Sequence, residues 1–298
     1  MTQKQNPPVS EKPINRITPG QRLRQYLRHP GSFALFLLVC LSALLCAAIL
    51  IYLIVYIVAN GVPNLTPELF AWEWNSENQS MVPALINTVI MVLLTLLMAV
   101  PIGIFAAIYL VEYARRGSRA VAVIRLTAET LAGIPSIVYG LFGYILFVLT
   151  LKWGFSLLAG AITLAIMVLP TIIRTTEEAL MAVSDTYREG SFGLGAGRVR
   201  TVFRVVLPSA VPGILAGVIL AIGRIVGESA ALIFTSGSAA AVPGGPFDSA
   251  RTLSVHMYCL MSEGLYTKQA YATAFVLLVL VVGINALSAF LAKRVQSK

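Results

Sequence analysis

Six apolar runs, each long enough to cross a lipid bilayer, dominate this sequence of 298 residues. A membrane-spanning helix needs about 20 predominantly apolar residues. Because unpaired backbone polar groups are costly in lipid, such runs fold as helices. The sequence therefore predicts an all-α polytopic membrane protein with six transmembrane helices, at about 32–59, 82–111, 131–151, 155–173, 210–234 and 271–291.

Composition agrees with burial in lipid and argues against a soluble nucleic-acid-binding protein. Hydrophobic residues make up 57% of the chain and charged residues 12%, whereas soluble domains carry about 25% charged residues. The formal net charge of +9 comes from basic residues in short segments between apolar runs, so we expect no nucleic-acid partner. The three cysteines and two histidines show no metal-ligand spacing, and we expect no metal site and no cofactor.

Lysine and arginine are concentrated in alternate segments between the predicted spans, and this pattern predicts the orientation in the membrane. They are frequent at both termini and scarce in 60–81 and 235–270. Both termini are therefore expected in the cytosol, with a cytosolic tail at 1–31 and a transmembrane domain at 32–298 whose core is about 82–292. The segment after the fourth predicted span carries Arg174, Arg188, Arg198, Arg200 and Arg204.

Two of the connecting segments are long, and the N-terminal segment is polar. The length of the first span and the polar residues before it argue against a cleavable signal peptide. The outer segment 235–270 contains a short apolar run at 253–261, which we expect to form a partly inserted helix. The inner segment 174–208 lies on the cytosolic side in this topology and is the one that points to a function.

This inner segment resembles the EAA motif of ATP-binding-cassette (ABC) importer permeases. In that motif Glu-Ala-Ala is followed by Gly after three residues and by Leu-Pro at the start of the next span. A short amphipathic helix that ends at the glycine would project as a knob on which a soluble motor acts. The alternative is an ordinary basic loop bound to anionic lipid headgroups. The residues that match the motif, two of them in place of its alanines, are Glu189, Gly190, Ser191, Gly195, Leu207 and Pro208.

The chain contains no Gly-x-x-x-x-Gly-Lys-Ser/Thr motif, which would cradle the phosphates of ATP. We therefore expect a subunit that is not an enzyme. The resemblance implies that a separate ATPase dimer docks on the cytosolic coupling loop at 174–208.

Two charged residues, Arg224 and Glu228, lie inside the fifth predicted span. They are four residues apart, which places them on one face of a continuous helix. A charge at the bilayer centre costs about 2.5–3.5 kcal/mol, so the pair should line a pore or pair internally. A guanidinium binds tetrahedral oxyanions, and this favours an anion path over a purely structural ion pair. Gly223 and Gly227 are expected to permit close approach of another helix.

The segment 224–235 resembles PstA-type permeases of high-affinity phosphate importers, whose pattern is close to Arg-x-x-Gly-Glu-Thr-Ala-x-Leu-Leu-Phe-Thr. Segments 101–113, 135–142 and 170–177 agree, and the likeness runs from about Asn87 to the C-terminus. It implies a type I importer permease with a MetI-like fold in the bacterial inner membrane, moving inorganic phosphate by alternating access. In that family the arginine and glutamate of this helix are implicated in phosphate passage, which maps onto Arg224 and Glu228.

The resemblance also implies three partners: a homologous permease that completes a heterodimer, the ATPase dimer, and an extracytoplasmic phosphate-binding protein. Two alternatives remain open. One is a permease of the same class for a different oxyanion or small solute, and the other is an ion-coupled secondary transporter. An intramembrane enzyme is disfavoured because no predicted span contains Asp or His.

Overall fold

The computed structural model describes residues 30–115 and 117–296, and within them every regular element is a helix. The predicted cytosolic tail at 1–31 lies outside the described residues except for its last two positions. The chain divides into two compact units, which meet between Tyr56 and Ile57. The first unit, as far as it is described, consists of most of helix α2 (Pro30–Gly61).

Helix α2 confirms the first predicted span and extends it by two residues at each end. Its 32 residues would measure about 48 Å along the axis, which exceeds the thickness of a bilayer core. Apolar side chains cover its whole circumference, as the exposed Leu35, Leu41 and Leu44 illustrate. A helix that is apolar all round is suited to lipid rather than to water.

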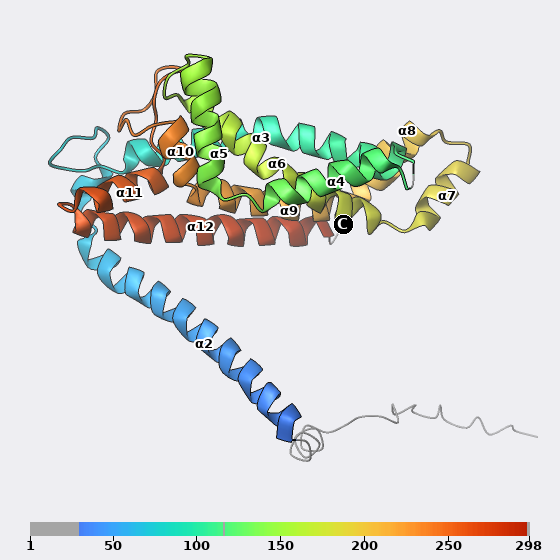
Figure 1. Cartoon of the computed structure of the whole chain (residues 1–298), viewed down its shortest axis with the longest axis horizontal. Helices are drawn as coiled ribbons and strands as arrows, with labels where there is room; N and C mark the ends of the chain where they lie inside the picture. Colours follow the sequence, from blue (N-terminus) through green and yellow to red (C-terminus); the bar gives the residue numbers. More distant parts are fainter. Residues whose placement is uncertain (1–29, 116, 297–298) are drawn as a thin grey trace, which may run out of the picture. The chain divides into compact units, whose positions relative to one another are not determined.

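The second unit is a bundle built on α3 (Val82–Ile108), α6 (Leu157–Met181), α9 (Leu207–Gly227) and α12 (Thr267–Gln296). Figure 1 shows these helices running side by side, with α6 packed on both α3 and α9, and α9 packed on α12. The core between them is made of buried side chains, among which are Met91, Leu164, Met167, Ile172 and Ile225. In the described residues five helices are long and apolar enough to cross a membrane.

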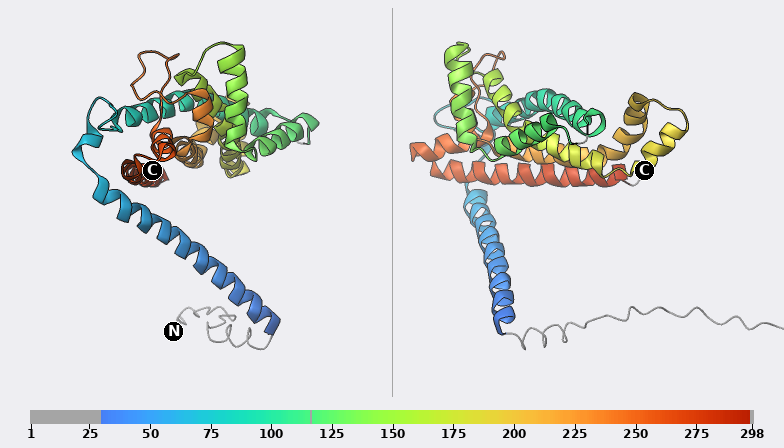
Figure 2. Two further views of the ribbon diagram at one scale, coloured as in Figure 1. Left: turned by 60° about the vertical axis from the view of Figure 1, so that its left-hand side comes forward. Right: turned by 45° about the vertical axis from the view of Figure 1, so that its right-hand side comes forward.

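The third predicted span, 131–151, is not one straight helix. The chain instead forms α4 (Arg119–Ala132) and α5 (Ser136–Gly143), the latter continued by a π-helical segment Tyr144–Thr150, and the two parts are bent by 100°. Pro135 explains the break, because proline lacks an N–H donor and pushes the preceding residue out of the helical region. The Tyr139 hydroxyl donates a hydrogen bond of 2.8 Å to the Leu131 carbonyl across the bend. Figure 2 shows α5 standing across the other helices of its unit.

Small residues allow the helices of the bundle to approach closely, although not at every predicted position. A Cβ on Gly140 would lie 2.8 Å from the Ala231 Cα, and one on Gly217 would lie 1.9 Å from the Thr175 Oγ1. The expectation for Gly223 and Gly227 is wrong, because a Cβ at either position would meet nothing closer than 3.9 Å. The close contact of α9 with α6 is made at Gly217, which precedes both of these glycines in α9.

The predicted cytosolic loop at 174–208 is mostly helical. Helix α6 continues to Met181, and α8 (Arg198–Thr201) joins a π-helical segment and α9 in one helix, Arg198–Gly227. Between them lies α7 (Asp185–Gly193). In Figure 1, α7, α8 and the C-terminal end of α12 lie at one end of the bundle, while α10 (Ala230–Thr235) and α11 (Leu253–Glu263) lie at the other. The predicted topology requires this arrangement, because it places 174–208 and the C-terminus on the cytosolic side and 235–270 on the outer side.

Candidate functional site

Helix α7 has the sequence signals and the geometry of an independent short helix. Ser184 precedes it and accepts a hydrogen bond from the Thr186 N–H. Gly195 ends it with φ of +82°, a conformation that favours glycine. The Gly195 N–H donates to the Phe192 carbonyl at 2.9 Å, and the Ala196 N–H donates to the Ser191 carbonyl at 3.1 Å. These two bonds form a Schellman motif, so the predicted helix ending at Gly195 is confirmed.

The matched motif residues lie on a projecting surface. Glu189 and Gly190 are exposed, and Leu194 at the tip is 91% exposed. A single side-chain hydrogen bond of 2.8 Å, between Ser191 Oγ and Thr201 Oγ1, links α7 to α8. Leu207 and Pro208 begin α9, but they lie inside the continuous helix Arg198–Gly227 rather than at its start. A partner on this side of the bundle would therefore meet α7 first.

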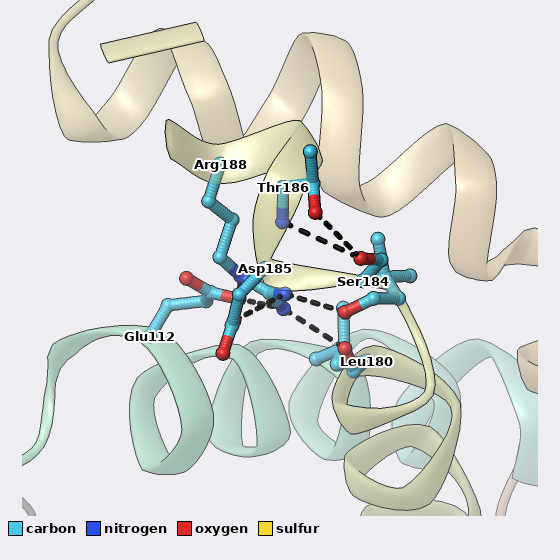
Figure 3. Close-up of polar contacts among 7 residues, drawn as sticks. Glu112, Leu180, Ser184, Asp185, Thr186 and Arg188 are labelled. Atoms are coloured by element: carbon cyan, nitrogen blue, oxygen red, sulfur yellow. Dashed lines mark hydrogen bonds and ion pairs between the residues drawn. The ribbon is translucent and has the colours of Figure 1, made fainter. Parts of the chain in front are cut away.

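Arg188, which the sequence marked only as one of several basic residues, is the centre of a dense polar cluster at the base of α7. Its Nε and Nη2 donate to Glu112 Oε1 at 3.1 and 2.7 Å. Its Nη1 donates to the Val183 carbonyl at 2.7 Å and to Asp185 Oδ1 at 3.2 Å, and Nη2 also donates to the Leu180 carbonyl at 2.9 Å. Figure 3 shows the guanidinium enclosed by these groups.

In the membrane core the structure corrects the predicted geometry of Arg224 and Glu228. Helix α9 ends at Gly227, and Glu228 has extended backbone angles of φ −77° and ψ 124°. The two residues therefore do not share the face of a continuous helix. No ion pair joins them in the part of the chain that the structure describes.

Glu228 instead organises the start of the next helix. Its Oε1 accepts a hydrogen bond of 3.0 Å from the Ala231 N–H, at the N-terminus of α10. Its carbonyl accepts one of 2.6 Å from Ser254 Oγ on α11. A carboxylate at this position bonds a donor that the helix leaves free and complements the positive end of the helix dipole. The break between α9 and α10 is therefore held by the acidic side chain.

Arg224 lies partly exposed in the last turn of α9. Among the described residues its guanidinium has neither a hydrogen bond nor an ion pair, although it lies close enough to the Tyr139 hydroxyl to interact with it electrostatically. A guanidinium without a carboxylate partner keeps its donors available for another oxyanion.

A cavity of about 850 Å³ opens one turn of α9 away from Arg224, where Leu220 forms part of its wall. Helices α4 and α6 supply the charged part of the lining. Arg125 Nε donates to Glu177 Oε1 at 2.7 Å, and Arg174 Nε donates to Glu178 Oε1 at 3.0 Å. The arginines of the cavity are thus paired with carboxylates, in contrast to Arg224.

The opposite end of the bundle holds a buried basic pair that the sequence did not single out. The Arg251 guanidinium lies 5.1 Å from the centre of the Trp74 ring, and burial lowers its pKa. His256 on α11 is completely buried. Burial and the nearby positive charge of Arg251 lower the pKa of His256 to about 3, so the imidazole is neutral at ordinary pH.

A bundle of long apolar helices with a short projecting helix at one end is typical of the membrane subunit of a transporter driven by a soluble partner. Residues 99–297 match the family described as binding-protein-dependent transport system inner membrane component, and the chain belongs to this family. The predicted multi-pass location in the inner membrane is confirmed by this membership. The family consists of permease subunits, which agrees with the expectation that the chain is not an enzyme.

Curated relatives include the phosphate transport system permease protein PstA of Mycobacterium leprae, which is 36% identical over 217 residues and is matched over 71% of both chains. PstA of Yersinia pestis is 40% identical over 162 residues, 54% of each chain. The chain spans 66% of one further relative's length and 50% of another's. The predicted resemblance to PstA-type permeases is confirmed.

Solved structures share the fold at low sequence identity. A chain of a bacterial alginate ABC transporter, in complex with a pentasaccharide-bound periplasmic protein, is 17% identical with a TM-score of 0.67, over 91% of this chain and 98% of that one. A chain of the MetNI methionine ABC transporter is 19% identical with a TM-score of 0.54, over 72% and 93%. These matches confirm the type I, MetI-like permease fold.

Proposed function

We propose that this chain is the permease subunit of an ATP-driven importer of inorganic phosphate, which works by alternating access. The observation that carries the proposal is the guanidinium of Arg224, in the last turn of α9 of a chain related to PstA permeases, which has no hydrogen bond or ion pair among the described residues. A planar guanidinium donates two parallel hydrogen bonds to a tetrahedral oxyanion, which fits phosphate.

Arg224 and Glu228 both belong to the proposed path, in different roles. Arg224 would bind the anion directly. Glu228 would shape the path, because its carboxylate holds the break at which α9 ends and α10 begins. From Arg224 the path continues towards the cavity beside Leu220. There Arg125 and Arg174 already donate hydrogen bonds to the carboxylates of Glu177 and Glu178. An anion that reaches the cavity would therefore not be held by these arginines and would be released.

We further propose the assembly in which this chain acts. A homologous permease would complete a heterodimer, and an extracytoplasmic phosphate-binding protein would deliver the ion to the end that carries α10 and α11. An ATPase dimer would dock on α7 through the exposed surface around Glu189, Gly190 and Ser191 and the Gly195 turn. A secondary transporter has no need of such a projecting helix, and this favours the ABC class.

The substrate proposal is tested by uptake of labelled phosphate in cells that carry Arg224→Gln as their only copy of the subunit. Losing a charge-assisted hydrogen bond, worth about 1.5–3 kcal/mol, should lower uptake by about 10- to 100-fold at unchanged membrane abundance. The matched control is Arg119→Gln, at the exposed start of α4 and outside the coupling loop, which should leave uptake unchanged. Normal phosphate uptake by Arg224→Gln would contradict the proposal.

A further inference from the structure

The base of α7 is joined to the membrane helices by one side chain whose donors are all used. Arg188 carries five N–H donors, and its five hydrogen bonds go to Glu112, Asp185 and the carbonyls of Leu180 and Val183. The side chain of Arg188 is 13% exposed and that of Glu112 is 9% exposed. The ion pair is therefore largely shielded from water and screened little by salt.

These partners come from three different elements. Glu112 belongs to the π-helical segment Tyr109–Tyr113 that ends α3. Leu180 lies in the last turn of α6, and Val183 follows its end, so neither carbonyl receives a regular helical bond from the residue four positions on. The Leu180 carbonyl also accepts a bond of 3.3 Å from the Val183 N–H. A cation at this end also complements the negative end of the α6 dipole. Figure 3 shows Arg188 descending from α7 between these two helix ends. One residue thus fastens α7 to both α3 and α6.

The link from α7 to the helix that contains α9 is of a different kind and includes no ion pair among the described residues. It consists of the turn around Gly195, the hydrogen bond between Ser191 and Thr201, and packing against the π-helical segment before Leu207. A glycine with φ of +82° and open space around it allows this turn to bend. Displacement of α7 therefore reaches α3 and α6 through the bonds of Arg188, and α9 through packing and a turn that can bend.

We infer that Arg188 and Glu112 form a clamp that carries the motor's stroke from α7 into α3 and α6, which move with it as one body. Helix α6, from Pro170 to Met181, supplies part of the charged wall of the cavity of about 850 Å³. A movement of α6 against α4 and α9 would open or close that cavity. Arg188 is in this sense a positioning residue, and the inference rests on the proposed function as an ATP-driven permease.

The first test compares Glu112→Gln with two controls in the complete complex, reconstituted with its ATPase and binding protein. Glu112→Gln removes the buried partner charge of Arg188 and leaves the exposed surface of α7 untouched. We expect the ATPase to co-purify normally and ATP hydrolysis to continue, while phosphate imported per ATP falls by about 10-fold or more, since a buried charge without its partner is strongly unfavourable. Glu68→Gln and Arg119→Gln, at exposed positions outside the coupling loop 174–208, should retain the normal ratio.

The second test measures the clamp without transport. Spin labels at the exposed Tyr187 on α7 and Tyr109 at the end of α3 report the distance between the two elements, in a background where Cys40, Cys46 and Cys259 are serine. With the clamp intact we expect one distance, with or without ATP, and in Glu112→Gln a second distance on addition of ATP. A single unchanged distance in both proteins, or a normal ratio of phosphate to ATP in Glu112→Gln, would overturn the inference. If the unmodified complex imports no phosphate, the proposed function fails while the label distances still decide on the clamp.

Discussion

Two arginines of this subunit, Arg188 and Arg224, differ in how many hydrogen-bond partners the fold gives their guanidinium groups. Arg188 at the base of α7 is enclosed, and its side chain donates to a carboxylate on another helix and to two main-chain carbonyls. Arg224 near the end of α9 has no hydrogen bond or ion pair among the described residues, although Glu228 is only four positions away. The comparison teaches that a saturated guanidinium builds a rigid junction, whereas an unsaturated one remains available for a ligand.

The same substitution at both positions should separate these roles. Arg188→Gln leaves Glu112 buried without its partner and should lower the free energy of unfolding by about 3–5 kcal/mol. Arg224→Gln removes no hydrogen bond or ion pair among the described residues and should change the free energy of unfolding by less than about 0.5 kcal/mol. Thermal unfolding of the solubilised protein checks both. Equal losses of stability in the two variants would remove the distinction between a structural and a ligand-binding arginine.

The opposite end of the bundle extends the comparison to a buried base that stays neutral. His256 has a pKa of about 3 in the folded protein, against about 6.5 when unfolded. Between these values the unfolded state binds more protons, so stability is complete above pH 6.5 and falls as the pH is lowered towards 3. Between pH 6.5 and 5 the loss should be about 2 kcal/mol.

The pH dependence of the unfolding temperature measures this loss, and His256→Gln provides the reference because glutamine does not titrate. The variant should show a flatter profile below pH 6.5 than the unmodified protein. Parallel profiles would mean that His256 is hydrated or partnered in the folded state.

Arg224→Lys sharpens the ligand-binding side of the comparison. Lysine keeps the positive charge but offers a compact ammonium instead of a planar fork. We expect uptake to fall by about 10-fold, corresponding to about 1.4 kcal/mol, mainly through a higher KM for phosphate, with stability unchanged. Uptake equal to that of the unmodified protein would show that Arg224 acts only as a diffuse charge.

Effects of about 1–2 kcal/mol or less are expected at two glycines of α7 and its end. A Cβ at Gly190 would meet nothing within 4 Å, so Gly190→Ala should stabilise the helix by up to about 1 kcal/mol. Gly195→Ala should destabilise the helix end by about 1–2 kcal/mol, because φ is +82° there. Thermal unfolding measures the opposite changes in stability of the two variants, and co-purification of the ATPase reports whether each still binds it. A gain in stability at Gly195 would contradict the assigned helix ending.

Local signals predicted the parts of this protein that depend on neighbours in the sequence. The apolar runs predicted α2, α3, α6, α9 and α12, because a bilayer demands helices of that length. The glycine at 195 predicted the end of α7, because few other residues adopt its backbone conformation. The basic segments predicted an orientation that agrees with the place of α7 and of the end of α12.

Only the tertiary structure decided which charges meet. Glu112 and Arg188 are 76 positions apart, and no periodicity links them. Arg224 and Glu228 are close in sequence and were expected to share one face of a helix. Glu228 instead leaves the helix, because its carboxylate bonds the start of α10 and its carbonyl is held by Ser254. The physical reason is that an apolar run forms a membrane-spanning helix in response to the lipid around that helix alone. A charged side chain takes the partner that packing brings within hydrogen-bonding distance, and that distance depends on every helix at once.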